Sequence, residues 1–211
     1  MDSDDYLINN AVEKIQSYIN KYKDKEEIGA FFFHYKTEDG NIIKPIGYII
    51  NEDKVMTRYE YNNQYIQNDG CVCYFGKVVK KYIYPEFEGE KYVGPTVIQL
   101  LMANEYKMVF SPEVIGVAEY KEDGLTHIGR QLRLRNPMGM IYYAKLMIDS
   151  KAKISTQIKY AISIWPYASI AKKSLIDVMN LVERPILLLL SYVPGKILAI
   201  YWKKYTRLVF K

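Results

Sequence analysis

The chain has 211 residues, of which 49% are hydrophobic and 25% are charged. This composition excludes general disorder, and the length allows a substantial core. The net charge of +5 is unevenly distributed: residues 1–128 hold 14 Lys and Arg against 21 Asp and Glu, a net charge of −7, whereas residues 129–211 hold 15 against 3, a net charge of +12. A segment this basic favours an anionic partner, namely a phospholipid surface, a nucleic acid or an acidic protein face, including the acidic part of the chain itself.

The N-terminus and the cysteines indicate a reducing, cytoplasmic environment. The first ten residues, MDSDDYLINN, are acidic and contain no apolar run, unlike a secretory signal or a transit peptide. Cys71 and Cys73 are two residues apart on a predicted strand, so their side chains face the same way but lie too far apart for an easy disulfide. We therefore expect reduced thiols. The abundance of Lys and Tyr, with 21 tyrosines, is typical of an A+T-rich genome and reflects origin rather than function.

The first part of the chain alternates helix and strand signals. A helix is expected over residues 5–22, with Ile8, Val12, Ile15 and Ile19 on one face. A hairpin is expected over residues 28–51, because Asp39-Gly40 supplies the turn chemistry that it needs. A second hairpin is expected to join residues 114–120 to residues 125–128 through the similar turn at 121–124.

Further elements follow between the two hairpins. Residues 71–84 read as a strand interrupted by Gly76, residues 95–106 as a short helix, and residues 108–110 as a strand that Pro112 ends. These elements predict an α+β domain over residues 1–135, with a mainly antiparallel sheet and flanking helices.

The boundary of this domain is expected near residue 135. Residues 131–135 alternate strictly, which favours an edge strand with Leu132 and Leu134 facing inward. Residues 136–139, Asn-Pro-Met-Gly, indicate a turn. Residues 136–211 are then expected to form a basic helical docking region, beginning with a helix over residues 140–148.

The end of the chain is the most distinctive segment of the sequence. An amphipathic helix is expected from Pro166, and residues 186–202 contain only one charge, Lys196. Nine aliphatic side chains would contribute on the order of 3–5 kcal/mol to membrane insertion, and Lys196 near the bilayer centre would cost about 2.5–3.5 kcal/mol. Because insertion comes out near zero, we expect a bent arrangement in the plane of the membrane, with a corner at Pro194-Gly195.

This interpretation makes a set of side chains the candidate docking surface for a membrane or a protein partner. The set is Leu187, Leu188, Leu190, Val193, Lys196, Leu198, Tyr201, Trp202, Lys203, Lys204 and Arg207. Burial of the same segment in the protein's own core, or in a subunit contact, remains the competing interpretation.

Two alternatives from other functional classes remain. A nucleic-acid-binding structural protein, such as a packaging or virion component, would use basic side chains interleaved with aromatic ones. The anion-binding candidates are Arg130, Arg133, Arg135, Lys151, Lys153 and Lys159. A cysteine-dependent enzyme would pair Cys71 or Cys73 with His34 or His127.

Other chemistry finds little support in the sequence. The two histidines are 93 residues apart and no metal-ligand motif is present, so no metal and no cofactor are expected. Glu86, Glu88 and Glu90 are expected to form a solvated acidic loop. With no catalytic residue to name, the sequence favours a non-enzymatic adaptor or structural protein whose basic, apolar C-terminal helices dock on a membrane surface or into a larger protein assembly.

Overall fold

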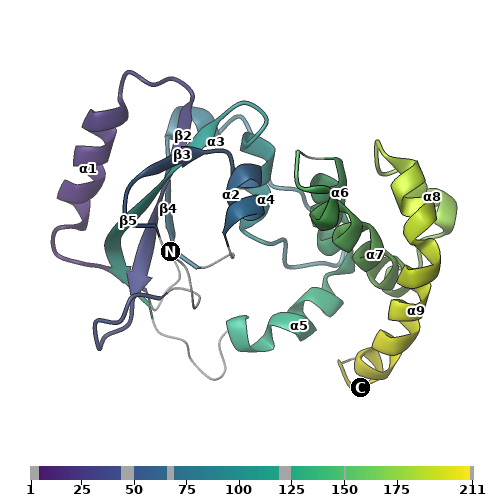
Figure 1. The fold of residues 1–211 in the computed structure, drawn as a ribbon. Coiled ribbons are helices and arrows are strands. Elements are labelled where there is room, and N and C mark those ends of the chain that lie inside the picture. The colour runs from purple at the N-terminus through teal and green to yellow at the C-terminus, as the bar shows by residue number, and fades with distance from the viewer. Residues whose placement is uncertain (1–4, 44–49, 66–68, 119–124, 150, 210–211) are drawn as a thin grey trace. The chain divides into compact units, whose positions relative to one another are not determined.

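The computed structural model describes residues 5–43, 50–65, 69–118, 125–149 and 151–209, and for residues 125–128, 130 and 204–209 it describes the backbone alone (Figure 1). The chain forms two compact units. The first comprises residues 1–83 and 98–121, and the second comprises residues 84–97 and 122–211. The expected α+β class is confirmed, whereas the expected boundary at residue 135 stays a prediction.

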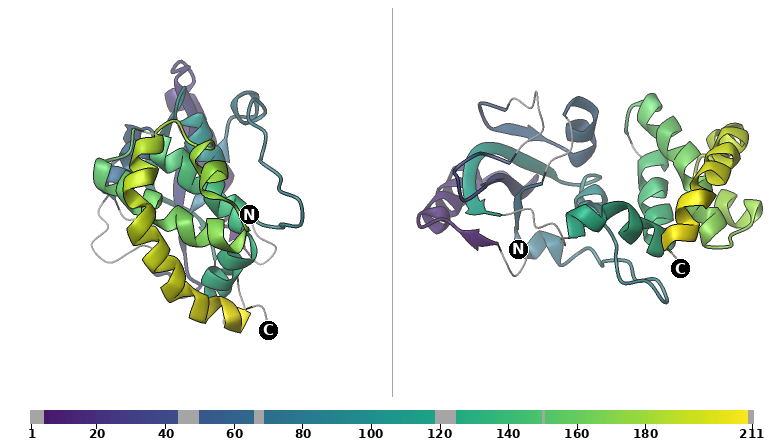
Figure 2. Two further views of the ribbon diagram at one scale, coloured as in Figure 1. Left: turned by 90° about the vertical axis from the view of Figure 1, so that its right-hand side faces the viewer. Right: turned by 90° about the horizontal axis from the view of Figure 1, so that it is seen from below.

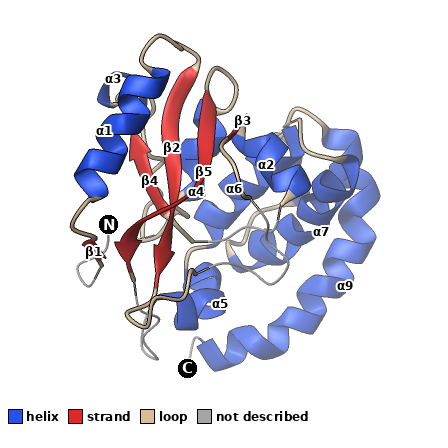
Figure 3. Cartoon of the chain, turned by 60° about the vertical axis from the view of Figure 1, so that its left-hand side comes forward, coloured by secondary structure: helices blue, strands red, loops and turns tan. Residues whose placement is uncertain are grey.

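A five-stranded, mostly antiparallel sheet forms the centre of the first unit (Figure 3). The strand order is β1-β5-β2-β4, and β3 also pairs with β5. The central β2–β5 pair is parallel, and the other three pairings are antiparallel. The strands are β1 (Tyr6–Leu7), β2 (Ile28–Lys36), β3 (Lys54–Met56), β4 (Cys71–Tyr74) and β5 (Lys107–Val117).

Strand β2 is buried on both faces, as its nearly continuous apolar sequence, IGAFFFHYK, predicts. Phe31 and Phe33 pack under helix α1 (Ala11–Tyr22) on one face. Ala30 and Phe32 belong to a second cluster on the other face, which includes side chains from the remaining helices of this unit. Those helices are α2 (Arg58–Gln64), α3 (Gly76–Val79) and α4 (Thr96–Met102). The last of them confirms the helix expected over residues 95–106.

The N-terminal helix begins later than expected. Tyr6 and Leu7 pair with Val117 and Gly116 of β5, which holds this segment extended, and α1 begins only at Ala11. Val12, expected in the core, is 68% exposed.

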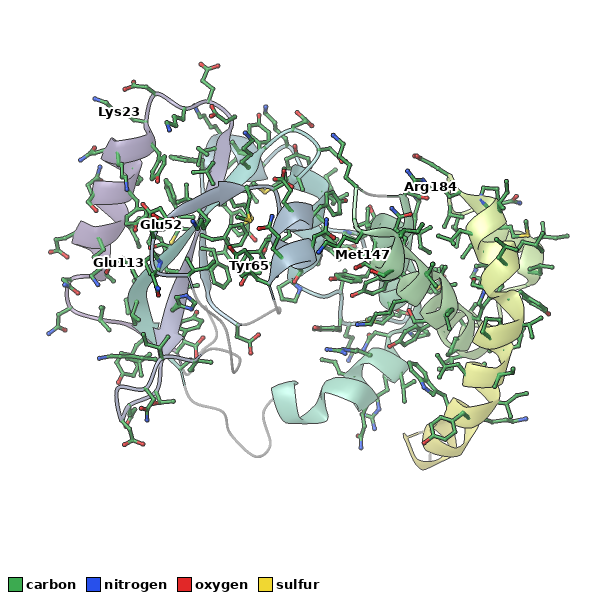
Figure 4. The ribbon with its side chains drawn as sticks, in the orientation of Figure 1. Lys23, Glu52, Tyr65, Glu113, Met147 and Arg184 are labelled. Carbon is green, nitrogen blue, oxygen red and sulfur yellow. The ribbon has the colours of Figure 1, made fainter. Side chains whose placement is uncertain are left out.

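A carboxylate at the start of β3 attaches α1 to the sheet. Asp53 accepts hydrogen bonds from Tyr18 Oη (2.6 Å), Lys21 Nζ (2.5 Å) and Tyr22 Oη (3.1 Å). Burial by itself would raise the pKa of Asp53, but these donors outweigh it and hold the pKa below its ordinary value. Nearer the start of the helix, Lys14 Nζ lies 2.5 Å from the carboxylate of Glu113, which is labelled in Figure 4.

Strand β5 continues through Pro112, contrary to the expectation that this proline ends it. Phe110 lies opposite Phe32 and Val114 lies opposite His34, so four steps along β5 correspond to two along β2. The extra residues form an irregularity of the β-bulge type, which tolerates a residue without an N–H.

Only part of the two expected hairpins is found. The first turn is present, because Thr37 N donates to Asn41 O and Gly40 has a φ of +87°. Most of its second arm, residues 44–49, lies outside the described residues. The second hairpin is wrong, because the segment expected as its second strand is the start of a helix, α5 (Leu125–Arg135).

The second unit is helical around one apolar cluster. Leu134, Ile141, Ile164, Trp165 and Leu188 are among its fully buried members. The helices are α5, α6 (Pro137–Asp149), α7 (Ile154–Ile170), α8 (Leu175–Met179) and α9 (Pro185–Val209).

The expected edge strand at residues 131–135 and the turn after it are wrong. Residues 131–135 are the last turns of α5, in which Leu134 is buried. Helix α6 begins at Pro137, because a proline at the first helical position has no N–H to lose. The helix expected over residues 140–148 is confirmed as part of α6.

Hydrogen bonds connect the acidic loop before α4 to the junction between α5 and α6. Glu90 accepts hydrogen bonds from the backbone N–H of Met138 (2.6 Å) and of Gly139 (2.8 Å), so its carboxylate caps α6. Asn136 Oδ1 accepts from the backbone N–H of Lys91 and of Tyr92. The interpretation of Glu90 as part of a solvated loop is therefore wrong, although Glu86 and Glu88 are exposed.

Pro166, expected to begin a helix, and Pro194, expected to form a corner, both lie inside helices. Pro166 lies within α7, so the expected helix starting at Pro166 is wrong, and only α8 forms between residues 171 and 184. Pro194 lies within α9, so the expected corner at Pro194-Gly195 is also wrong. A proline inside a helix costs about 3 kcal/mol or more, and the packing of α7 against α9 offsets this cost.

Candidate functional site

Helix α9 is apolar around most of its circumference, which a surface helix is not expected to be. Its sequence from residue 186 to residue 202 contains one charge, so hydrophobicity alone does not show which face is buried. Helix α9 runs alongside α7, and this pair makes one of the most extensive contacts between elements of the chain (Figure 2).

The inner face of α9 is built around Trp165 of α7. The indole Nε1 donates to Ser191 Oγ at 3.1 Å. Ser191 Oγ also lies 2.8 Å from Ala161 O and 2.9 Å from Leu188 O, either of which can accept its proton. A Cβ added at Gly195 would lie 2.1 Å from Trp165 Cδ1, so only glycine admits the indole at this point.

The outer face of α9 carries a continuous apolar stripe. Its members recur at three- and four-residue spacing, and each is between 54% and 74% exposed. They are Ile186, Leu189, Leu190, Val193, Ile197, Ile200 and Tyr201, and we call them the outer stripe.

The N-terminal end of α9 is fixed to the rest of the unit. Arg184, which lies just before the helix (Figure 4), donates from Nη1 to Gln157 Oε1 at 2.9 Å. The backbone N–H of Glu183 donates to Asp149 Oδ1 at 2.9 Å. Together with the Trp165 contact, these bonds hold the inner face of α9 in place.

Basic side chains accompany the outer stripe. Lys196 Nζ lies 5.5 Å from the centre of the Tyr192 ring, in a cation–π contact. Lys203 is exposed near the C-terminal end of the helix. Lys204 and Arg207 lie on the backbone of α9, but their side chains are outside the described part of the structure.

The predicted docking residues divide between the two faces. Leu190, Val193, Tyr201 and Lys203 are exposed. Leu188 is fully buried in the core, so its inclusion in the docking set is corrected. Leu187, Lys196, Leu198 and Trp202 are half-buried. The expected docking set omits Ile186, Leu189, Ile197 and Ile200, because a helix assumed to break at Pro194 gives no continuous face.

Length and composition allow a membrane-spanning reading of the same helix. Within the described residues, only Pro185–Lys203 is a helix long and apolar enough to cross a membrane, and 17% of it is buried inside the protein. One helix of this kind is weak evidence of membrane association.

The anion-binding candidates lie on two elements. Arg133 and Arg135 are exposed on the last turns of α5. Lys151 and Lys153 precede α7, and Lys159 lies within it with Nζ 5.8 Å from the centre of the Tyr160 ring. The side chain of Arg130 is outside the description. The role of this set in anion binding stays a prediction.

His34, one of the two candidate bases for the cysteines, lies on the opposite face of the sheet from them. Cys71 lies opposite Phe33 and Cys73 opposite Phe31, and all four side chains belong to the cluster under α1. The His34 ring instead packs against Phe32, 5.9 Å between centres, on the other face of the sheet. His127 lies outside the described side chains. No group of three or more His, Cys, Asp or Glu side chains among the described residues could hold a metal ion.

No protein family matches the chain, and no curated protein or solved structure is detectably similar to it.

Proposed function

We propose that this protein is a non-enzymatic adaptor that docks on an anionic membrane surface through the outer stripe of α9. The observation that carries this proposal is the outer stripe itself. Seven apolar side chains are exposed on one face of a helix whose other face is fixed to the protein. Contiguous exposed apolar surface of this kind marks an interaction site.

The fixed inner face favours docking in the membrane plane over spanning. A spanning α9 would have to leave Trp165 and expose the buried Ser191 hydroxyl, or take α7 with it into the bilayer. Lying in the interface, α9 keeps these contacts and buries only the outer stripe.

The free energy of membrane binding has an apolar and an electrostatic part. Full burial of an aliphatic side chain contributes about 1.5–3 kcal/mol, so partial burial of the outer stripe contributes roughly 5–10 kcal/mol. Binding costs several kcal/mol in return, because the protein loses translational and rotational freedom and its interfacial side chains become ordered. Each Lys or Arg near an anionic surface adds about 1 kcal/mol. The basic side chains of residues 129–211 therefore decide the preference for anionic lipid.

Flotation of the full-length protein with lipid vesicles tests this proposal. We expect it to float with vesicles that contain phosphatidylserine and to float far less with vesicles of phosphatidylcholine alone. A triple variant, Ile186→Ser, Leu190→Ser and Val193→Ser, should lose most of this binding, because it removes three of the seven apolar side chains of the outer stripe, all in its N-terminal half.

A matched control removes exposed apolar side chains from the other unit. Val12→Ser with Ile83→Ser changes side chains that are 68% and 87% exposed, and it should leave flotation unchanged. The membrane proposal is overturned if the wild-type protein stays at the bottom of the gradient with both vesicles. It is also overturned if the triple variant loses self-association in light scattering without any change in flotation, since the stripe would then be a contact between copies of the chain.

A further inference from the structure

The connection between α7 and α8 combines exposed basic and exposed apolar side chains. Residues 172–177, Lys-Lys-Ser-Leu-Ile-Asp, are all exposed. Lys172 and Lys173 follow the end of α7, and Leu175 and Ile176 begin α8, with exposed fractions of 37% and 70%. We call these four residues the α8 tip.

The α8 tip lies on the same side of the second unit as α9. Val178 of α8 is fully buried in the apolar cluster that also contains Trp165 and Leu188, so the inner face of α8 is fixed as that of α9 is. Helix α8 contacts α9, and both lie on the side of the unit away from α6 (Figures 1 and 2). A membrane that meets the outer stripe is therefore adjacent to the α8 tip.

The backbone of the α8 tip is held in one conformation by hydrogen bonds on both sides. The backbone N–H of Lys173 donates to Ala168 O of α7 at 2.9 Å. At the start of α8, Ser174 Oγ accepts from the backbone N–H of Asp177 at 3.1 Å, and Asp177 Oδ2 accepts from the backbone N–H of Ser174 at 2.8 Å, which is a capping box. The α8 tip can therefore bind a surface without the ordering cost of a flexible loop.

Lys172 occupies a backbone position that favours glycine. Its φ is +54°, in the left-handed region where the Cβ of an L-residue lies too close to the following carbonyl oxygen. The backbone N–H of Lys172 donates to Ser169 O at 3.4 Å, so Lys172 is the left-handed residue of a Schellman motif, where glycine is usual. Folding stability would favour glycine here, which points to a role for the exposed ammonium group.

We infer that the α8 tip binds anionic lipid headgroups: Lys172 and Lys173 contact the headgroup phosphates, and Ile176 enters the apolar layer beneath them. Two ammonium groups against the one carboxylate of Asp177 give residues 172–177 a positive charge. The inference rests on the proposed membrane docking and names the side chains that contribute its preference for anionic lipid.

Substitution of the two lysines tests the headgroup contact. A Lys near an anionic surface changes affinity by about five-fold, so Lys172→Gly with Lys173→Gln should weaken binding of the full-length protein to phosphatidylserine vesicles roughly 25-fold. Lys77→Gln with Lys80→Gln removes the same charge from exposed positions of the first unit and should leave binding unchanged.

The single variant Lys172→Gly separates the headgroup contact from a structural role. It should weaken vesicle binding about five-fold, while its urea midpoint should equal or exceed that of the wild-type protein, because glycine relieves the left-handed strain. If Lys172 were instead required by the fold, the variant would lower the urea midpoint as well as the affinity.

An environment-sensitive fluorophore tests whether Ile176 enters the membrane. A nitrobenzoxadiazole label at Ile176→Cys, with Cys71 and Cys73 replaced by Ser, should shift to shorter wavelength and brighten when phosphatidylserine vesicles are added. The same label at Leu190→Cys reports on the outer stripe, and circular dichroism confirms that both labelled proteins are folded.

The two proposals fail in different ways. The inference about the α8 tip is overturned if the double lysine variant binds vesicles as tightly as its control, or if the label at residue 176 keeps its emission in buffer while the label at residue 190 shifts. In those cases docking through the outer stripe still stands. If the wild-type protein does not bind the vesicles at all, the proposed function and this inference are both overturned.

Discussion

Single side chains decide how α9 is held. Trp165 fits against α9 because Gly195 has no side chain, and the buried indole N–H is satisfied by Ser191. A buried donor left without a partner would cost about 1–3 kcal/mol, so the serine and the glycine act together. Because Ser191 and Gly195 fix the rotation of α9 about its own axis, the outer stripe is left exposed.

Gly195→Ala should therefore lower the free energy of unfolding of the second unit by about 1–3 kcal/mol, because overpacking forces the indole or the helix to move. Trp165 and Trp202 are the only tryptophans of the chain, so urea unfolding followed by tryptophan fluorescence reports on this unit.

Gly76→Ala is a suitable control, since a Cβ at that helical glycine meets nothing within 4 Å. Equal urea midpoints for the two variants would contradict the role assigned to Gly195.

At the scale of elements, polar side chains attach segments that are distant in sequence. Glu90 and Asn136 join the acidic loop to the start of α6 through four backbone N–H groups. In the first unit, Asp53 attaches α1 to the sheet through three donors. Hydrogen bonds to charged groups, here Glu90 and Asp53, make a net contribution of about 1.5–3 kcal/mol each, so each attachment is significant against the marginal stability of a domain.

The attachment of α1 should depend on pH. The folded pKa of Asp53 is held below its unfolded value of about 3.9, so its contribution is present above that pH and is lost as pH falls through the folded pKa. We expect Asp53→Asn to destabilise the first unit by about 1.5–3 kcal/mol at pH 7.

Urea unfolding followed by far-ultraviolet circular dichroism at pH 7 and at pH 3 measures this contribution. The difference between wild type and Asp53→Asn should shrink at pH 3. A difference of the same size at both pH values would contradict the assignment of Asp53 as the attachment point.

At the scale of the whole molecule, charge and apolar surface coincide in one unit. The second unit contains 16 Lys and Arg against 8 Asp and Glu, a net charge of +8, and the first contains 13 against 16, a net charge of −3. The outer stripe belongs to the basic unit. This coincidence favours a surface that is both apolar and anionic over a polynucleotide, which does not reward long aliphatic side chains.

Vesicle binding should accordingly have two components. Raising the salt concentration screens the electrostatic contribution, since the Debye length falls from about 10 Å at 0.1 M to about 3 Å at 1 M. We expect affinity for anionic vesicles to fall several-fold over this range but to stay measurable, because apolar burial persists. Binding to single-stranded DNA that is tighter than binding to vesicles and disappears with salt would favour the nucleic-acid alternative.

Elements with strong local signals were predicted correctly. The helices at residues 95–106 and 140–148, the turn that ends in Gly40 and the α+β class all follow from composition and spacing. Residues 131–135 alternate like a strand but form a helix, because Leu134 is required in the core of the second unit. Pro112, Pro166 and Pro194 were each expected to end or start an element, and each lies inside one, because bulges and packing compensate for the missing N–H.

The sequence by itself determined that the C-terminal part of the chain is basic and that residues 186–202 are apolar. It did not determine which apolar side chains face water, because α9 is hydrophobic on both faces and periodicity cannot distinguish them. Only the tertiary structure decided this, since the indole of Trp165 fits α9 only at Gly195 and Ser191, and this contact turns Leu188 inward and Leu190 outward.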